Sequence, residues 1–387
     1  MSEDRENQRE IYLDNSATTR VCPESAQAVM EIMTQNYGNA ASLHRKGYEA
    51  EQVLIHAKKT FASVLGCQES EIYFTSGATE SNNMCLIGAA KARRRQGNKI
   101  VITGLEHPSV LEPAAYLERE GWEVVRVMPN EQGSFTPEQF AEVVDENTVL
   151  VSTMFVNNET GLILPVQEIA KAVKRKNPKV LFHTDAVQGF MKLPLKLRNS
   201  QIDLLSASGH KVYAPKGIGL LYIKKGVRLT PLFYGGGQQN GVRVGTDSVP
   251  LIGGFAAAVE ANAVKIQEHL KHYQSLKEHL LKLAESAEEI TVNSTDACAP
   301  FVVNLSVDRI RSEVMLHFLE QRGIYVSSGS ACSKGEKSHV LRALGLPSER
   351  IDTALRLSFS PQTTKEDLDE FMAACHAGYS QLAKLKR

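Results

Sequence analysis

The sequence predicts an α/β protein whose largest part is a mainly parallel sheet. Short apolar segments that resemble strands alternate with helical patterns through the first two thirds of the chain. Such alternation is typical of βαβ crossovers, which build a parallel sheet covered by helices on both faces. The 387 residues also exceed one compact core at roughly 150 residues per domain, so we expect two or three domains.

The elements of this region follow in order from their patterns. Pro23 begins a helix, and further helices are expected at 48–65, from Thr79 to about 95, at 110–120 and at 169–176. One face of the first helix carries Ala26, Val29, Met30 and Met33. The expected strands are 72–75, 100–103, 123–127, 149–156, 180–184, 204–207 and 220–223. Ligands of such sheets bind where the strands end, at their carboxyl edge.

A change of pattern marks the expected domain boundary. From about Gly254 to Ser286 the sequence reads as one long helix with polar faces, which predicts a large domain of residues 15–258 and a smaller α+β domain of residues 1–14 and 259–387. The shorter units of the last third are expected strands at 300–307, 324–327 and 354–359 and helices at 312–321 and 339–344. Thr363 and Glu366 have the spacing of a capping box for a final helix.

Composition removes several classes of function. The 44 basic and 44 acidic side chains cancel, so there is no electrostatic argument for direct nucleic-acid or membrane-surface binding. No apolar run approaches the length of about 18 residues that a membrane span needs. The polar start of the chain shows no signal sequence, and the six cysteines show no zinc-like spacing. We therefore expect a cytoplasmic protein with reduced cysteines and no metal site.

Two residues at predicted strand ends suggest a carbonyl cofactor. Lys211 follows an apolar strand within Ser-Gly-His-Lys, and a lysine in such surroundings can form a Schiff base. Asp185 ends the preceding strand, where a carboxylate can pair with the pyridinium nitrogen of pyridoxal phosphate. The alternative for Asp185 is a helix N-cap, and the alternative for Lys211 is a solvated surface residue.

Three further signals are weaker when each is taken alone. The turn from Ser76 to Glu80 is either a phosphate cradle at a helix start or an ordinary turn. His107 is either a residue that stacks on a ring and moves protons or a structural histidine. Cys332 lies among small and polar residues that favour an exposed loop, which suits a thiolate nucleophile, whereas the other five cysteines read as structural.

Together, in this order, the signals resemble the cysteine desulfurases of the class V aminotransferase superfamily. The resemblance covers about residues 11–375. It is carried by segments 12–19, 74–82, 106–107, 156–161, 183–188, 208–217 and 235–246 and by the Ser-Ser-Gly-Ser-Ala-Cys loop that ends at Cys332. That loop is similar to the group containing the iron–sulfur-cluster and nitrogen-fixation desulfurases. The resemblance implies the type I fold of pyridoxal-phosphate-dependent transferases, with a mainly parallel seven-stranded sheet in the large domain.

The resemblance also implies roles for residues around the cofactor. Lys211 would bind pyridoxal phosphate covalently and then act as base and acid, while His107 would stack on the ring and move protons. Asp185 would hold the pyridine nitrogen, and Gln188 the phenolic oxygen. The phosphate would be held by Ala78, Thr79, Ser208 and His210, and by Thr246 of the other subunit of a homodimer.

The implied reaction converts L-cysteine to L-alanine. Arg356 and Asn158 would bind the substrate carboxylate, although a salt-bridged strand arginine is the alternative for Arg356. Cys332 would hold the sulfur as a persulfide and pass it to an acceptor protein, such as a cluster scaffold or a tRNA-thiolation protein. The segment between Cys332 and His339 looks a residue or two shorter than usual for this group, which leaves the acceptor open.

Other functions remain compatible with the same residues. A selenocysteine lyase, or another class V enzyme such as an aminotransferase, would use the same cofactor site. A non-catalytic homologue would use the dimer surface for binding and would need none of Lys211, Asp185, His107, Arg356 or Cys332.

Overall fold

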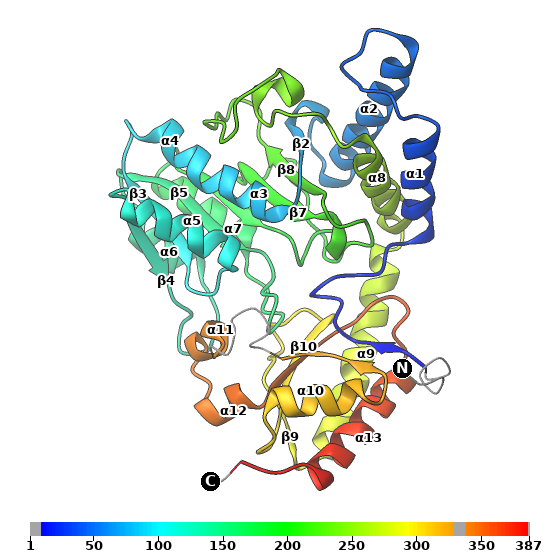
Figure 1. Ribbon diagram of the computed structural model, residues 1–387. Coiled ribbons are helices and arrows are strands. Elements are labelled where there is room, and N and C mark those ends of the chain that lie inside the picture. Colours follow the sequence, from blue (N-terminus) through cyan, green and yellow to red (C-terminus); the bar gives the residue numbers. More distant parts are fainter. Residues whose placement is uncertain (1–8, 329–336, 386–387) are drawn as a thin grey trace.

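A seven-stranded sheet forms the centre of the computed structural model, which describes residues 9–328 and 337–385 (Figure 1). The strand order is β2-β8-β7-β6-β5-β3-β4. Its strands are β2 (Ile72–Thr75), β3 (Lys99–Thr103), β4 (Glu123–Val127), β5 (Thr148–Met154), β6 (Leu181–Asp185), β7 (Leu204–Ser208) and β8 (Gly219–Ile223). Only β8 runs antiparallel to its neighbours in this sheet, so the predicted mainly parallel sheet is confirmed.

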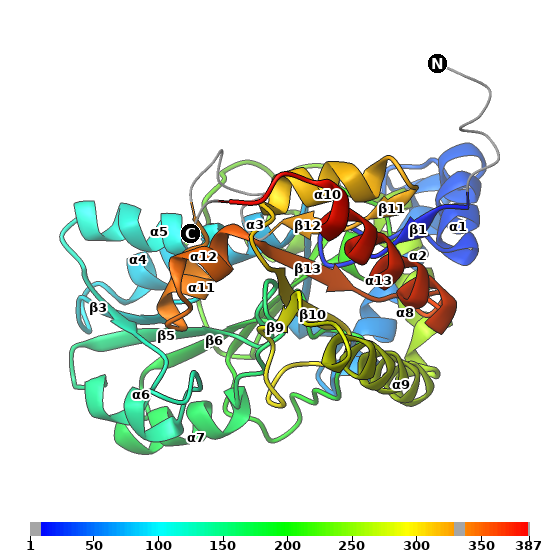
Figure 2. The same ribbon diagram turned by 90° about the horizontal axis from the view of Figure 1, so that it is seen from below.

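Helices cover both faces of this sheet, as βαβ crossovers require. Figure 2 shows α4 and α5 on one side and α6 and α7 on the other. The helices of these layers are α2 (Arg45–Leu65), α3 (Ala78–Asn83), α4 (Ala89–Arg93), α5 (Pro108–Arg119), α6 (Pro137–Val143) and α7 (Val166–Lys176). Successive residues of a strand face opposite helical layers. In β3, Ile100 packs in the apolar core on the α5 side and Val101 in the core on the α7 side. The sequence pattern does not predict α6, because its seven residues are too few to show a clear helical period.

The expected long helix at 254–286 is wrong. The chain instead forms α8 (Val249–Ala263) and α9 (Ile266–Glu285), which meet at an angle of 71°. Neither Pro nor Gly marks the break at Val264 and Lys265. Among the described residues no single helix is long and apolar enough to cross a membrane. The α8–α9 pair reaches that length and apolarity only when the bend is disregarded.

Helix α1 (Pro23–Thr34) packs along α8, yet part of its apolar face is exposed. Ile32 is buried, whereas Met30 and Met33 are 64% and 59% exposed. Exposed side chains of the same kind follow in the next segment, at Tyr37, Leu43 and Tyr48. This gives the chain an exposed apolar surface over α1 and the start of α2.

The last third of the chain contains a four-stranded antiparallel sheet. Its strand order is β12-β13-β10-β9. Its strands are β9 (Ile290–Val292), β10 (Val302–Val307), β12 (Ser327–Ser328) and β13 (Ala354–Ser358). The helices around it are α10 (Ser312–Glu320), α11 (His339–Ala343), α12 (Ser348–Asp352) and α13 (Lys365–Gln381). The capping box of α13 is Thr364 with Asp367, one residue later than predicted, because the Thr363 hydroxyl accepts from the Ser360 amide instead.

The N-terminal segment joins the two sheets. Strand β1 (Ile11–Tyr12) pairs in parallel with β11 (Ile324–Tyr325), and the Leu13 carbonyl accepts from the Ser358 amide of β13. Further along, the Thr19 amide donates to the His210 carbonyl just after β7. We call residues 13–19 the strap, because they connect the edge of the large sheet to the small one.

Candidate active site

The predicted residues gather at the carboxyl edge of the large sheet. Asp185 is the last residue of β6 and Ser208 the last of β7, and His210 and Lys211 follow in a single 3₁₀ turn. Ala78 begins α3, three residues after the end of β2. Parallel strands bring these ends together, as expected for a ligand site in such a sheet.

Carbonyl groups of the strap hold two of the predicted residues, Lys211 and Gln188. The Lys211 Nζ donates to the carbonyl oxygens of Ser16 and Ala17, each at 2.6 Å. Gln188 Nε2 donates to the same Ser16 carbonyl at 3.0 Å. The Gln188 Oε1 is buried and has no hydrogen-bond partner among the described residues, so it remains available to a ligand.

Asp185 is buried, and both of its oxygens accept hydrogen bonds. Oδ1 accepts from the Val187 amide at 3.0 Å, and Oδ2 accepts from Asn82 Nδ2 at 2.8 Å. The first contact is local turn chemistry, and a turn rather than a helix follows β6, so Asp185 is not a helix N-cap. The carboxyl group is thereby held in one orientation.

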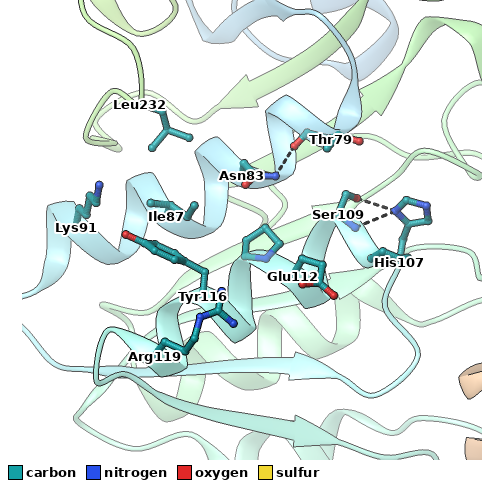
Figure 3. A pocket seen from close by; sticks show the side chains of 12 residues that line it. Thr79, Asn83, Ile87, Lys91, His107, Ser109, Glu112, Tyr116, Arg119 and Leu232 are labelled. Carbon is teal, nitrogen blue, oxygen red and sulfur yellow. Dashed lines mark hydrogen bonds between the residues drawn. The ribbon is translucent and has the colours of Figure 1, made fainter. Parts of the chain in front are cut away.

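His107 caps the start of α5. Its Nδ1 accepts from the Ser109 amide at 3.1 Å and lies 2.8 Å from the Ser109 hydroxyl (Figure 3). Burial lowers the pKa of His107, while the nearby Asp185 carboxylate opposes that shift. The neutral ring therefore carries its proton on Nε2, because Nδ1 is an acceptor. His107 and Thr79 line an open groove of about 620 Å³ beside α3 and α5.

Of the predicted phosphate residues, Ala78 and Thr79 begin α3, Ser208 ends β7 and His210 follows it, and Thr246 lies just before α8. A Cβ on Gly219 would come within 2.6 Å of the Gly77 backbone, so this close approach of two backbone segments needs a glycine. Ala78 and Ser208 are buried, whereas Thr79 and Thr246 are exposed. His210 Nδ1 lies 3.2 Å from the Thr18 hydroxyl, and burial lowers the pKa of His210 to about 4.

Arg356 reaches the same region from β13 of the small sheet. Its Nη2 donates to Asp14 Oδ1 at 2.6 Å and its Nη1 to the Asn158 carbonyl at 3.1 Å. Arg356 therefore forms a salt bridge with Asp14, which was the structural alternative to its predicted role in substrate binding. The Nε is nevertheless buried without a partner among the described residues, which leaves one donor of the guanidinium unused.

Several residues of this region carried no predicted role. Glu106 is fully buried beside His107, and burial raises the pKa of its carboxyl group to about 8. The Glu106 carbonyl accepts from His339 Nε2 at 3.2 Å, which brings α11 against the His107 segment. Asn82 and Ser109 lie between Asp185 and His107. Asn82 stands inside a motif of the resemblance, but nothing in the sequence indicated its contacts.

Cys332 lies outside the described residues. Among the described cysteines, burial raises the pKa of Cys67 to about 12 and raises the pKa values of Cys85 and Cys375 still further. Burial also raises the pKa of Cys22. These four thiols are therefore poor nucleophiles near neutral pH.

Comparison with known proteins agrees with this geometry. The profile of the class V aminotransferase family matches residues 11–371. The chain is 40% identical to "Cysteine desulfurase IscS" of Methanosarcina thermophila, over 94% of this chain and 90% of that protein. Among solved structures, a "NifS-like protein" superposes with a TM-score of 0.92 at 36% identity, covering 97% of this chain and 100% of the other. "SspA in complex with cysteine" gives a TM-score of 0.80 at 31% identity, covering 92% and 100%.

Proposed function

The chain belongs to the class V aminotransferase family, and on that premise we propose that it is a pyridoxal-phosphate-dependent cysteine desulfurase. It converts L-cysteine to L-alanine. The observation that carries this function is the convergence of Lys211, Asp185, His107 and Arg356 on one sheet edge, in a chain so similar to curated desulfurases. A non-catalytic homologue would need none of these four side chains.

The residues fit pyridoxal phosphate. Asp185 offers a buried, oriented carboxylate for the pyridine nitrogen, and the Gln188 amide nitrogen, which donates one proton to Ser16, has a second for the phenolic oxygen. The neutral His107 ring suits stacking on a heteroaromatic ring, and Lys211 supplies the amine that binds the aldehyde. Ala78, Thr79, Ser208 and His210 are the phosphate residues of this proposal, with Thr246 from a second subunit. When bound, the cofactor supplies an electron sink for charge that develops at the substrate α-carbon.

The chain's own residues divide the remaining work. Arg356 binds the substrate carboxylate, supported by its unused Nε and by the contacts to Asp14 and Asn158 that fix its position. Lys211 takes the proton from the substrate α-carbon on its Nζ. The neutral His107 holds a proton on Nε2 that it can donate within the site.

Sulfur transfer is assigned to Cys332. Its thiolate attacks the sulfur of the substrate, the carbon–sulfur bond breaks, and the carbon fragment becomes alanine. Cys332 then carries a persulfide whose outer sulfur passes to the thiol of an acceptor protein. The raised pKa values of Cys22, Cys67, Cys85 and Cys375 support this choice, because none of those thiols is ready to ionise.

A homodimer, a division into domains 15–258 and 1–14 with 259–387, and a cytoplasmic location complete the proposal. The dimer is supported by the exposed apolar side chains over α1 and the start of α2, since apolar side chains that cluster on a surface mark protein–protein contact sites. Phe233 and Tyr234 are also exposed, at 55% and 84%, in the segment that leads to Thr246.

The test measures alanine formed from L-cysteine by the wild type and by Cys332→Ala, with a reducing thiol present. We expect alanine from the wild type and none from the variant, while Cys67→Ala, the matched control, stays active. Equal alanine from Cys332→Ala would reject the persulfide and favour a lyase, which a parallel assay with selenocysteine would identify. No alanine from the wild type would reject the desulfurase itself.

A further inference from the structure

A chain of hydrogen bonds links Asp185 to His107 through two residues without an assigned role. Asn82 Nδ2 lies 2.8 Å from Asp185 Oδ2 and 2.8 Å from the Ser109 hydroxyl oxygen. The Ser109 hydroxyl lies 2.8 Å from His107 Nδ1, a contact drawn in Figure 3. Asn82 is fully buried and Ser109 is 8% exposed, so the middle of the connection is shielded from water, while its His107 end lines the open groove.

The direction of these bonds follows from the chemistry of the groups. An amide nitrogen carries two protons, and here one points to a carboxylate and the other to a hydroxyl. The reversed amide would turn its oxygen toward the Asp185 carboxylate, which would be repulsive. Because the Ser109 oxygen already accepts from Asn82, its own proton is left for Nδ1 of His107. The Ser109 amide donates to the same Nδ1.

We propose that Asn82 and Ser109 are positioning residues that couple the Asp185 carboxylate to the Nε2–H tautomer of His107. One buried amide orients the carboxyl group on one side and the serine hydroxyl on the other. The hydroxyl then stabilises the ring form whose Nδ1 is unprotonated. The inference rests on the proposed function only for the roles of Asp185 and His107.

Charged and titratable groups on neighbouring elements also act on His107. Asp185 at the end of β6 favours the protonated ring, whereas Lys211 after β7 and His339 on α11 oppose it. Glu106 precedes His107 directly in the chain. Substitution of Asn82 or Ser109 leaves all four groups in place, so a change in His107 would report on the hydrogen bonds themselves.

The test follows the ring nitrogens of His107 by ¹⁵N NMR of the full-length protein, labelled at histidine, with and without bound cofactor. In the wild type we expect an unprotonated Nδ1 and a protonated Nε2. Ser109→Ala removes a donor to the neutral ring, so the pKa of His107 should rise by roughly one unit. Ser109→Thr keeps the hydroxyl and should restore the wild-type titration.

The hydrogen bond from Asn82 to Asp185 is tested by measuring the affinity for pyridoxal phosphate. Asn82→Ala should raise the pKa of His107 and should also weaken pyridoxal phosphate binding about tenfold, since Asp185 loses a donor. Ser109→Ala should leave that affinity within about threefold, because it spares Asp185. If Asn82→Ala does not fold, the Ser109→Ala and Ser109→Thr pair still tests the His107 branch.

Ser152→Ala is the matched control, because the Ser152 hydroxyl lies 2.7 Å from a different buried histidine, His183. It should leave both His107 and cofactor affinity unchanged. An unaltered His107 titration in Ser109→Ala would overturn the proposal. The ¹⁵N titration needs no substrate, so a chain that makes no alanine but shows these shifts would refute the function and retain the coupling.

Discussion

Nη2 of Arg356 lies 2.6 Å from Oδ1 of Asp14, although 342 residues separate the two in the chain. The side chains of Arg356 and Asp14 are only 9% and 20% exposed. Such a shielded pair holds the guanidinium in one position, which lowers the entropic cost of the carboxylate binding proposed for Arg356. The position of Arg356 therefore depends on the first described residues as much as on its own strand.

Arg356→Ala should raise the KM for L-cysteine by roughly 10- to 100-fold, because a charge-assisted contact to the substrate carboxylate is lost. The effect on kcat should be smaller. The measurement is the rate of alanine formation at increasing L-cysteine concentration. Arg350→Ala removes a guanidinium that instead holds Asn293, and it should leave KM unchanged. A normal KM in Arg356→Ala would reject the assignment.

Lys211→Ala should abolish the visible absorbance of the purified protein, because the amine that binds the cofactor aldehyde is gone. The loss should be essentially complete and should persist after incubation with added pyridoxal phosphate. Lys216→Ala serves as the control, since Lys216 is exposed five residues further on. A chromophore bound covalently to the Lys211 variant would show that another lysine carries the cofactor.

Glu106 should make the folded protein less stable as the pH rises. Its pKa is raised from 4.5 to about 8, so between these values the unfolded chain is ionised while the folded chain keeps the proton. The unfolded state then binds fewer protons, and the free energy of unfolding falls with pH by on the order of a few kcal/mol.

Glu106→Gln should therefore gain stability relative to the wild type between pH 5 and 8. Urea unfolding at several pH values measures the difference, and comparison with the wild type cancels the other titrating groups. The exposed Glu120→Gln should show no such trend. A constant difference across this range would mean that Glu106 is ionised in the folded protein.

Met33→Glu should weaken the proposed homodimer. A charge placed in the exposed apolar surface loses burial and must be desolvated, so the dissociation constant should rise at least tenfold. Sedimentation velocity at several protein concentrations measures it. Val264 is 87% exposed at the bend between α8 and α9, and Val264→Glu is the control. An unchanged dimer in Met33→Glu would exclude this surface from the interface.

The sequence predicted the seven strands of the large sheet well, because each buried strand is a short apolar run bounded by turn residues. It did not specify that β8 runs antiparallel, since side-chain alternation is the same in both directions. The bend between α8 and α9 was missed because no proline or glycine marks it. The exposure of Met30 and Met33 could not be derived either, since an apolar stripe does not show what covers it.

In the candidate site, too, some residues were predictable from the sequence and others were not. Lys211, Asp185 and His107 were found because each follows a strand pattern, and strand ends are where ligands bind. The contacts of Asn82 with Ser109 and Asp185 span 27 and 103 residues, so no local pattern encodes them. The ion pair of Arg356 with Asp14 was named only as a general alternative, because a partner so distant in the chain is invisible to periodicity.

The strap has a consequence for the order of events during synthesis. Ile11 pairs with Ile324, and the Ser16 amide donates to the Ser358 hydroxyl, a partner that the ribosome adds 342 residues later. The large sheet can form earlier from its own βαβ units. Ser16 and Ala17 reach their final positions over Lys211 only when β13 is present. The nascent chain therefore carries a nearly complete sheet without a finished active site, and acquires that site in a late, long-range step.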